Sequence, residues 1–170
     1  LEIVKYLLEI GADSYSGRER NGGALLNASA NGHLEIVKYL IENGADINAE
    51  DNIDWTALIW ASYNGHLEIV KYLVENGAEI DYYIDKSALM NASYNGHLEI
   101  VKFLIENYAE IDAKDNNGNT ALMYASISGN LEIVKYLLEN GADINSKNDD
   151  GVTALLNASY EGQLEIVKYL

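Results

Sequence analysis

The sequence predicts an all-α fold, a solenoid of stacked helix-turn-helix units with β-hairpin-like loops projecting from them. The main observation is a heptapeptide that recurs through the whole chain. It reads LEIVKYL from Leu1, Leu34, Leu67, Leu131 and Leu164, and LEIVKFL from Leu98. The intervals are 33, 33, 31, 33 and 33 residues, and the sequence between the copies repeats as well. A period of this length is typical of a repeat solenoid, in which each unit is one supersecondary structure.

The first helix of each unit is indicated by apolar residues at helical spacing. Ala57, Leu58 and Ala61 lie at i, i+1 and i+4, which places them on one face of a short helix. Thr56 precedes this helix, and a hydroxyl at that position can accept a backbone N–H of the first turn. The residues equivalent to Thr56 are Gly23, Ser87, Thr120 and Thr153.

Glycines separate this helix from a second one. Gly65 predicts a tight turn between the two helices. The second helix follows, since Leu67, Val70 and Leu73 lie at i, i+3 and i+6. A further glycine closes this helix, at a position that favours a left-handed residue. The turn glycines are Gly32, Gly65, Gly96, Gly129 and Gly162, and the closing glycines are Gly44, Gly77 and Gly141.

The predicted helices are too short to be stable alone. Neither exceeds about ten residues, and an isolated helix needs roughly 12 to 15 residues. Each unit therefore has to stack on its neighbours and share a continuous core with them. The turn-rich segment between units, such as residues 45–54, is expected to project from the helix pair. We expect the loop tips to lie in a row beside the first helices and to line a concave groove.

The period organises residues 1–170 as a single array. The array starts with a partial repeat and ends with a truncated one, so it lacks the polar end caps that repeat arrays need for solubility. We expect it to be a fragment of a longer array. The interval of 31 residues places a two-residue deletion between Asp81 and Ser87, which shortens one loop. The predicted units are 1–17, 18–50, 51–83, 84–114, 115–147 and 148–170.

The composition excludes several classes of protein. The chain has no cysteine, so a disulfide framework and a thiolate metal site are impossible. No apolar run approaches the roughly 20 residues that span a bilayer, and the start of the sequence lacks the basic region of a signal peptide. The net charge of −16 would repel a phosphate backbone. We therefore expect a soluble, cytoplasmic protein without a nucleic-acid or membrane partner. A secreted effector that acts inside another cell would leave the same pattern.

The titratable residues recur with the period, which argues against catalysis. Glu35 and Lys38, three residues apart on the second helix, have counterparts in every unit and are expected to form solvated ion pairs. His33, His66 and His97 also recur at unit spacing. Stacked helices lie about 8 to 10 Å apart, so adjacent histidines cannot share a zinc ion at about 2.1 Å. We predict a structural role for these histidines, and no catalytic residue, metal, cofactor or small-molecule substrate.

The segments from Gly65 to Lys71 and from Gly44 to Asn48 resemble the ankyrin repeat family. The resemblance covers all 170 residues. It rests on the period, the G-H turn, the L-E-I-V-K helix and the G-A-D-I-N loop. It implies an ankyrin-repeat solenoid, in which ligands contact the loop tips and the exposed face of the first helices.

The chain departs from the family pattern at several positions. The family's Thr-Pro-Leu-His reads Thr-Ala-Leu-Ile from Thr56, and the chain has no proline at all. This loss should lower stability without changing the fold. Tyr108 replaces a closing glycine, and we expect Asn107 to take over the left-handed conformation. Asp54 replaces a loop glycine, and aspartate tolerates a positive φ better than most residues.

The resemblance places the binding residues at positions that vary between units while the framework stays fixed. The predicted partner-binding residues are Asn52, Ile53, Trp55, Tyr63, Asn64, Tyr82, Tyr83, Lys86, Tyr94, Asn95, Asn119 and Ile127. Several of them are aromatic and would gather in the middle of the groove, where exposed aromatic residues are the usual anchors of a binding hot spot. The other interpretation is that the aromatic residues pack between repeats. We expect such packing for Trp60 and Tyr124, whose positions face further inward.

These observations predict a non-catalytic protein–protein interaction module that binds a partner protein on its concave groove. Its acidity favours a partner with a basic surface, mainly through the rate of association. Two alternatives remain open. One is a targeting or spacer array attached to a catalytic domain elsewhere in a longer chain. The other is a passive or engineered consensus array without a natural ligand, which near-identical groove positions would favour.

Overall fold

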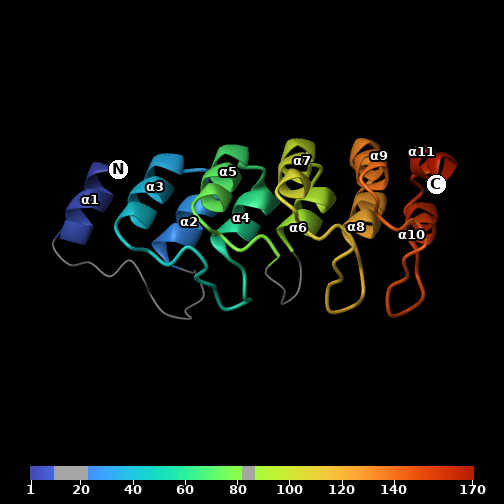
Figure 1. The fold of residues 1–170 in the computed structure, drawn as a ribbon, viewed down its shortest axis with the longest axis horizontal. Helices are drawn as coiled ribbons and strands as arrows, with labels where there is room; N and C mark the ends of the chain where they lie inside the picture. The colour runs from blue at the N-terminus through green and yellow to red at the C-terminus, as the bar shows by residue number, and fades with distance from the viewer. Residues whose placement is uncertain (10–22, 82–86) are drawn as a thin grey trace. The chain divides into compact units, whose positions relative to one another are not determined.

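The computed structural model describes residues 1–9, 23–81 and 87–170, and each repeat in these ranges contributes short helices joined by a tight turn (Figure 1). This all-α helix-turn-helix architecture is the one that the period predicts. The helices are α1 (Glu2–Glu9), α2 (Ala24–Ala30), α3 (Leu34–Glu42), α4 (Ala57–Asn64), α5 (Leu67–Glu75), α6 (Ala88–Tyr94), α7 (Leu98–Glu106), α8 (Ala121–Ser128), α9 (Leu131–Glu139), α10 (Ala154–Tyr160) and α11 (Leu164–Tyr169).

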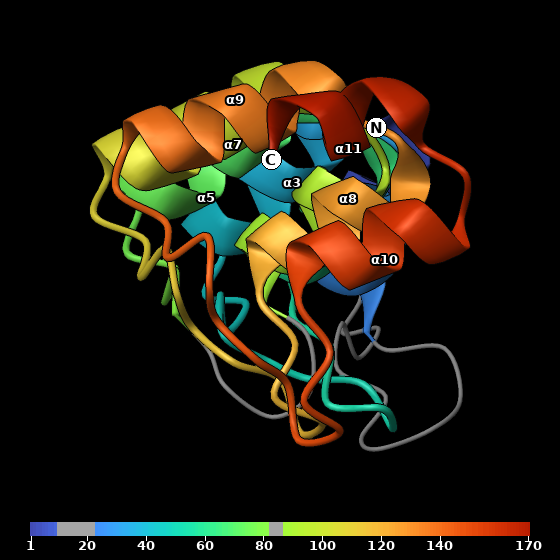
Figure 2. The same ribbon diagram turned by 90° about the vertical axis from the view of Figure 1, so that its right-hand side faces the viewer.

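The chain divides into two compact units, Leu1–Glu79 and Ile80–Leu170. In the first unit, α2 packs against α4, and α3 packs against α5. In the second unit, α6, α8 and α10 pack side by side as the first helices of their repeats, and α9 packs against both α7 and α11 in the other layer. Figure 2 shows α9 and α11 in one layer, α8 and α10 in the other, and the loops projecting from the helix pairs.

The core forms where the two helices of a repeat meet. The second helix buries its valine and leucine completely, as Val134 and Leu137 show in α9. The first helix buries two alanines, Ala121 and Ala125 in α8, which allow neighbouring helices to approach closely. Fully burying a valine or leucine side chain contributes roughly 1.5–3 kcal/mol. Stacking therefore supplies the stability that helices this short lack on their own.

Side-chain caps fix the start of the first helices. Thr120 accepts the N–H of Met123 at 3.4 Å in α8, and Ser87 accepts the N–H of Met90 at 3.3 Å in α6. Gly23 offers no side chain, and α2 begins without a side-chain cap. The residues predicted to cap the first helices are therefore their N-caps. Among these first helices, α2 alone has no side-chain cap.

The turn between the two helices of a repeat is bonded to the repeat before it. His66 Nε2 lies 3.1 Å from the carbonyl oxygen of Ala30. Asn130 fills the same position in the second unit and donates from Nδ2 to the carbonyl oxygen of Ser93 at 2.9 Å. The close approach requires a glycine opposite, because a Cβ on Gly32 would lie only 2.8 Å from the His66 ring. His66 thus has the structural role that its spacing predicts.

The residue that closes the second helix is left-handed in each described repeat. Gly77 and Gly141 have φ angles of 94° and 96°. Tyr108 has a φ of 69°, whereas Asn107 before it has a φ of −100°. The expectation that Asn107 adopts the left-handed conformation is wrong. Its side chain donates to the carbonyl oxygen of Phe103 at 2.8 Å and helps to end the helix, so the turn falls on the next residue.

A hairpin-like turn forms the tip of the loops. In the first unit, the N–H of Asp51 donates to the carbonyl oxygen of Trp55 at 3.1 Å, and Glu50 and Thr56 form an isolated antiparallel bridge. Asp54 lies inside this turn with a φ of 61°, which confirms its role in place of glycine. Gly118 and Gly151 stand at the equivalent position of two repeats in the second unit, with φ angles of 77° and 76°.

Bonds from a side chain to the backbone join successive loops. Asn48 accepts the N–H of Glu79 at 3.0 Å, and Asp81 accepts the N–H of Glu110 at 3.1 Å. Burial raises the pKa of Asp81, and the Glu110 carboxylate raises it further. The Glu110 N–H opposes these effects, but the pKa stays above its usual value. Ionised Asp81 therefore lowers the stability of the fold, whereas the uncharged Asn48 makes the equivalent bond without this penalty.

The predicted ion pairs form on the exposed face of the second helices. Lys71 lies 2.9 Å from Glu68, and Lys135 lies 2.8 Å from Glu132. These pairs are open to solvent, so each contributes little to stability, as is usual for exposed pairs at this spacing. They form a charged, solvated face of the array.

Candidate functional site

Asp51 organises the loop tip of the first unit. Its side chain is buried and accepts the backbone N–H groups of Ile53 and Trp55, both at 3.0 Å. Its second oxygen accepts the indole N–H of Trp60 at 2.8 Å. One carboxylate therefore joins the loop tip to the first helix of the same repeat, α4. Because these three donors reach both oxygens, neither oxygen of this buried side chain is left without a hydrogen bond.

Three aromatic side chains gather beside this carboxylate, and we call Trp55, Trp60 and Tyr63 the tryptophan cluster. The ring centroids of Trp55 and Trp60 lie 4.6 Å apart, and those of Trp55 and Tyr63 lie 5.5 Å apart. Trp60 and Tyr63 meet edge to face at 6.2 Å. Such tilted pairs contribute roughly 0.5–1.5 kcal/mol beyond the area that they bury. The cluster is thus one continuous aromatic surface rather than a set of separate side chains.

The tryptophan cluster remains open to solvent on one side. Tyr63 is exposed, and Trp55 and Trp60 are partly exposed. Ile53, two residues before Trp55 at the loop tip, is exposed as well. Rings that touch at these distances leave no space for a ligand between them. They can offer their outer faces to a flat or extended surface.

The polar residues predicted in the first unit differ in their availability. Asn52 is exposed at the loop tip. Asn64 is also exposed, but its side chain donates to the carbonyl oxygen of Trp60 at 2.9 Å and so helps to end α4. Asn52 is therefore the freer of the two for contact with a partner.

Asp115 has the same role in the second unit. It is buried, and it accepts the N–H groups of Asn117 at 2.9 Å and Asn119 at 2.7 Å and the phenol O–H of Tyr124 at 2.6 Å. Burial is the largest single influence on the pKa of Asp115 and raises it. The bonds from Tyr124, Asn119 and Asn117 together outweigh burial, so the pKa of Asp115 lies below its usual value.

The second unit carries a smaller aromatic surface. Tyr94 of α6 is exposed and meets the buried ring of Tyr124 edge to face, with centroids 6.1 Å apart. Ile127 is partly buried. Asn95 donates to the carbonyl oxygen of Asn91 at 2.9 Å. Tyr94 is the most available contact among these residues.

Asn119 belongs to the framework more than to the surface. Its Nδ2 donates to Asp115 at 3.2 Å, and its Oδ1 accepts from Nδ2 of Asn148 at 2.9 Å. Both ends of the side chain are therefore engaged in loop contacts, one of them with the next repeat. Contact with a partner would have to compete with these bonds.

The structure thus arranges the predicted residues in two groups, one in each unit. Tyr82, Tyr83 and Lys86 lie outside the described residues. Trp60 was expected to pack inward, and it does contact its neighbours but stays partly exposed. Tyr124 is buried, as its inward position predicts.

Sequence reasoning missed the two aspartates that hold the aromatic residues. The signal was a spacing of nine residues, which separates Asp51 from Trp60 and also Asp115 from Tyr124. Both pairs join an acidic loop residue to an aromatic donor in the following helix. Recurrence of such a pair within a repeat predicts a hydrogen bond, which apolar periodicity alone does not reveal.

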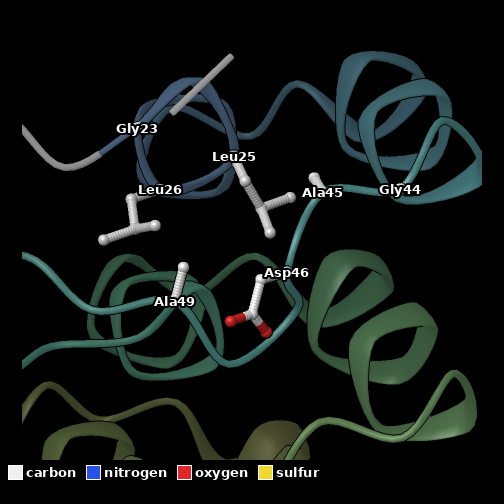
Figure 3. Close-up of a pocket in the computed structure, with 7 residues that line it drawn as sticks. All are labelled: Gly23, Leu25, Leu26, Gly44, Ala45, Asp46 and Ala49. Atoms are coloured by element: carbon white, nitrogen blue, oxygen red, sulfur yellow. The ribbon is translucent and has the colours of Figure 1, made fainter. Parts of the chain in front are cut away.

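The first unit also has a small hollow between α2 and the loop that follows α3. Figure 3 shows Leu26 and Ala49 pointing toward one another across it, with Asp46 at its edge. Its volume is about 190 Å³, below the roughly 300–1,000 Å³ typical of ligand pockets. It is therefore a gap between packed elements rather than a pocket of the usual size for a ligand.

Other kinds of site find no support in the described residues. Within them, no group of three or more His, Asp or Glu side chains could hold a metal ion. No helix in the described ranges combines the length and apolarity needed to cross a membrane.

Comparison with protein families finds a match to ankyrin repeats. The sequence model of ankyrin repeats, in three copies, matches residues 1–84 and 82–148. The comparison with curated proteins gives no match.

Proposed function

The chain belongs to the ankyrin repeat family, and from this premise we propose that it is a non-catalytic module that binds a partner protein through its loop tips and first helices. Ankyrin repeats are generally protein–protein interaction modules. The proposed contact residues are the tryptophan cluster with Asn52 and Ile53 in the first unit, and Tyr94 in the second. The absence of cysteine favours action in a reducing compartment, such as the cytoplasm.

The observation that carries this proposal is the exposed side of the tryptophan cluster. Large aromatic side chains are the commonest anchors of protein interfaces, where a single truncation can cost 2 kcal/mol or more. The rings are held by Asp51 and by one another before any partner arrives. Such preorganisation lowers the entropic cost of binding, because fewer rotamers have to be frozen.

The charge of the chain indicates the chemistry of the partner. A net charge of −16 on 170 residues attracts a basic surface and repels an acidic one. Long-range attraction acts mainly on the rate of association, and salt screens it. We therefore propose a partner with a basic contact surface that presents apolar or flat side chains to Trp55 and Tyr63.

The test is affinity capture from a cell lysate. Wild type is compared with a Trp55→Ala, Tyr63→Ala double variant of verified helicity. Tyr108→Ala is the matched control, because Tyr108 is an exposed aromatic residue just after α7, a second helix, and lies outside both contact groups. The proposal predicts a protein that wild type and the control retain and the double variant loses. Equal retention by all three chains, or by none, would favour a spacer array.

A further inference from the structure

Asparagine is followed directly by glycine at several places in the chain, and the fold treats one of these Asn–Gly steps differently from the rest. One step, at Asn21, lies outside the described residues. Among the described steps, all but one lie at the ends of helices, and the remaining one lies at a loop tip of the second unit. The asparagines of the described steps are Asn31, Asn43, Asn64, Asn76, Asn95, Asn117 and Asn140.

An Asn–Gly step can lose ammonia without an enzyme. The main-chain nitrogen of the glycine attacks Cγ of the asparagine and forms a bond to it. The bond between Cγ and Nδ2 breaks, and Nδ2 leaves as ammonia with the proton of the glycine N–H. Water then opens the resulting five-membered imide to aspartate or isoaspartate. Glycine favours this attack because it has no side chain to shield its nitrogen or to restrict the backbone.

The steps at helix ends have their carboxamides held by hydrogen bonds. Nδ2 of each asparagine donates to the carbonyl oxygen four residues before it, at distances of 2.7–2.9 Å. The carboxamide is therefore directed back along its helix, and this bond has to break before Cγ can meet the following nitrogen. The glycine N–H is bonded as well in all of these steps except the one at Asn95, for which no such bond is described.

The carboxamide of Asn117 is not held in this way. Asn117 is exposed at its loop tip, and its carboxamide makes no hydrogen bond to a described residue. The N–H of Gly118 donates to the carbonyl oxygen of Asp115 at 2.9 Å, and the N–H of Asp149 donates to that of Asn117 at 3.0 Å. Attack therefore needs the loop tip to open, but no carboxamide bond has to break. A loop tip opens at a lower free energy than a packed helix.

We propose that Asn117 deamidates spontaneously in the folded chain, and that it does so faster than the asparagine of any other described Asn–Gly step. Each event replaces a neutral carboxamide by a carboxylate, so it adds one negative charge to a loop tip of the second unit. Asn117 is equivalent in its repeat to Ile53, one of the proposed contact residues of the first unit. The reaction itself does not depend on the proposed function.

The next repeat shows that the fold accepts the aspartate product. Asp150 stands at the position equivalent to Asn117. Its N–H donates to a side-chain oxygen two residues earlier at 3.1 Å, as the N–H of Asn117 does at 2.9 Å. The glycines that follow them, Gly118 and Gly151, have φ angles of 77° and 76°. Isoaspartate differs, because it adds a methylene to the main chain and moves the Gly118 N–H away from its acceptor.

The test follows deamidation of the 170-residue chain at mildly alkaline pH. Peptide mapping by mass spectrometry locates each event, because aspartate and isoaspartate are one mass unit heavier than asparagine. A parallel sample unfolded in urea gives the rate of each step without the fold. The ratio of the folded rate to the unfolded rate then measures how far the fold protects each asparagine, independently of its neighbours in the sequence.

We expect this ratio to be largest at Asn117. It should exceed the ratio at Asn95 roughly two- to tenfold, which is the factor that one net hydrogen bond supplies. A ratio at any other described step that equals or exceeds that of Asn117 would overturn the proposal. So would a folded chain in which Asn117 does not react while the unfolded chain does.

Two variants assign the charge change in the intact chain. Asn117→Gln removes the proposed site, since the longer side chain forms a cyclic imide far more slowly. Asn140→Gln is the matched control at a step whose carboxamide is held. Isoelectric focusing of the aged, folded chains should show one acidic species fewer for Asn117→Gln than for wild type, and the wild-type pattern for Asn140→Gln. An unchanged pattern for Asn117→Gln would contradict the proposal.

Discussion

Tyr108 closes α7 in a conformation that favours glycine. Its φ is 69°, its side chain is 92% exposed, and the equivalent residues Gly44, Gly77 and Gly141 have φ angles of 87°, 94° and 96°. A Cβ at those glycines would meet no atom within 4 Å. The tyrosine is therefore sterically accepted and is disfavoured only by its backbone conformation.

Replacing this tyrosine by glycine should stabilise the chain. Tyr108→Gly is expected to raise the free energy of unfolding by roughly 0.5–1 kcal/mol, which is the left-handed strain less the greater chain entropy of glycine. Gly141→Tyr is the matched reverse change and should lower it by a similar amount. Urea denaturation followed by circular dichroism measures both. A destabilised Tyr108→Gly chain would show that the tyrosine ring makes contacts that outweigh the strain.

The carboxylate of Asp115 should contribute to stability only when it is charged. Its pKa lies below the ordinary value of 3.8 because bonds from Tyr124 and two backbone N–H groups outweigh burial. A group with a lowered pKa stabilises the folded state above its unfolded pKa, and this stabilisation is lost as the pH falls through the folded pKa. The free energy of unfolding of wild type should therefore fall between about pH 4 and pH 2.

Asp115→Asn tests this pH dependence. The variant should be less stable than wild type at pH 7, and the difference should shrink below about pH 4. Asp150→Asn, at an exposed loop position, is the control and should follow wild type. Urea denaturation at a series of pH values gives the comparison. A difference that stays constant from pH 7 to pH 2 would mean that Asp115 does not act through its charge.

At the scale of the loops and turns, Asp81 differs from Asp115, because its pKa is raised rather than lowered. Burial and the nearby charge of Glu110 raise its pKa, so ionisation is disfavoured in the folded state. This penalty is absent at low pH and appears as the pH rises through the folded pKa. Asp81→Asn should therefore stabilise the chain at pH 7 and have less effect near pH 3, because Asn48 shows that asparagine can make the same bond. Loss of stability at pH 7 would instead indicate that the charge strengthens the bond to Glu110.

The turn between α8 and α9 depends on one side chain. Asn130 donates to the carbonyl oxygens of Ser93 at 2.9 Å and Tyr94 at 3.1 Å. Asn130→Ala should cost about 0.5–1.5 kcal/mol, because the carbonyl groups of Ser93 and Tyr94 lose their donor. Asn130→His should recover most of this loss, since His66 makes the equivalent bond in the first unit. Thermal unfolding compares wild type with the two variants. If Asn130→Ala were as stable as wild type, the Asn130 side chain would not stabilise the turn.

The regular elements could be predicted because local signals repeat along the chain. Thr120 marks the start of a first helix, and apolar spacing defines the second helix that contains Val134. Asp54 could also be identified, since only a few residue types tolerate a positive φ. Tyr108 could not, because the choice between it and Asn107 depends on which residue completes the helix-ending bonds.

The candidate site could be predicted only in part. The repeat indicates which positions lie at loop tips, and Trp55 and Tyr63 do meet there. Their orientation depends on Asp51, whose buried carboxylate binds groups up to nine residues away. No periodic pattern of apolar residues contains that information. The prediction that aromatic residues of both units form one surface in the middle of a groove stays a prediction.

At the scale of the whole molecule, repetition explains both the fold and the variation on it. The second helices α3, α5, α7 and α9 bury the same valine and leucine, and stacking lets short helices form. The repeated residues are therefore required for stability, whereas the residues at the loop tips can differ from one repeat to the next. Trp55 and Trp60 belong to one such variable region, and they are the only two tryptophans of the chain.

Because both tryptophans of the chain belong to the tryptophan cluster, a tryptophan label gives a direct test of the binding proposal. The chain is prepared with 5-fluorotryptophan, so that two ¹⁹F NMR signals arise, both from the tryptophan cluster. Trp55→Phe assigns them. The captured partner is then added without label until it saturates the chain. We expect the Trp55 signal to shift or broaden as the partner binds. Two unchanged signals from a chain that is fully bound would contradict the proposal, because the partner would then contact another surface.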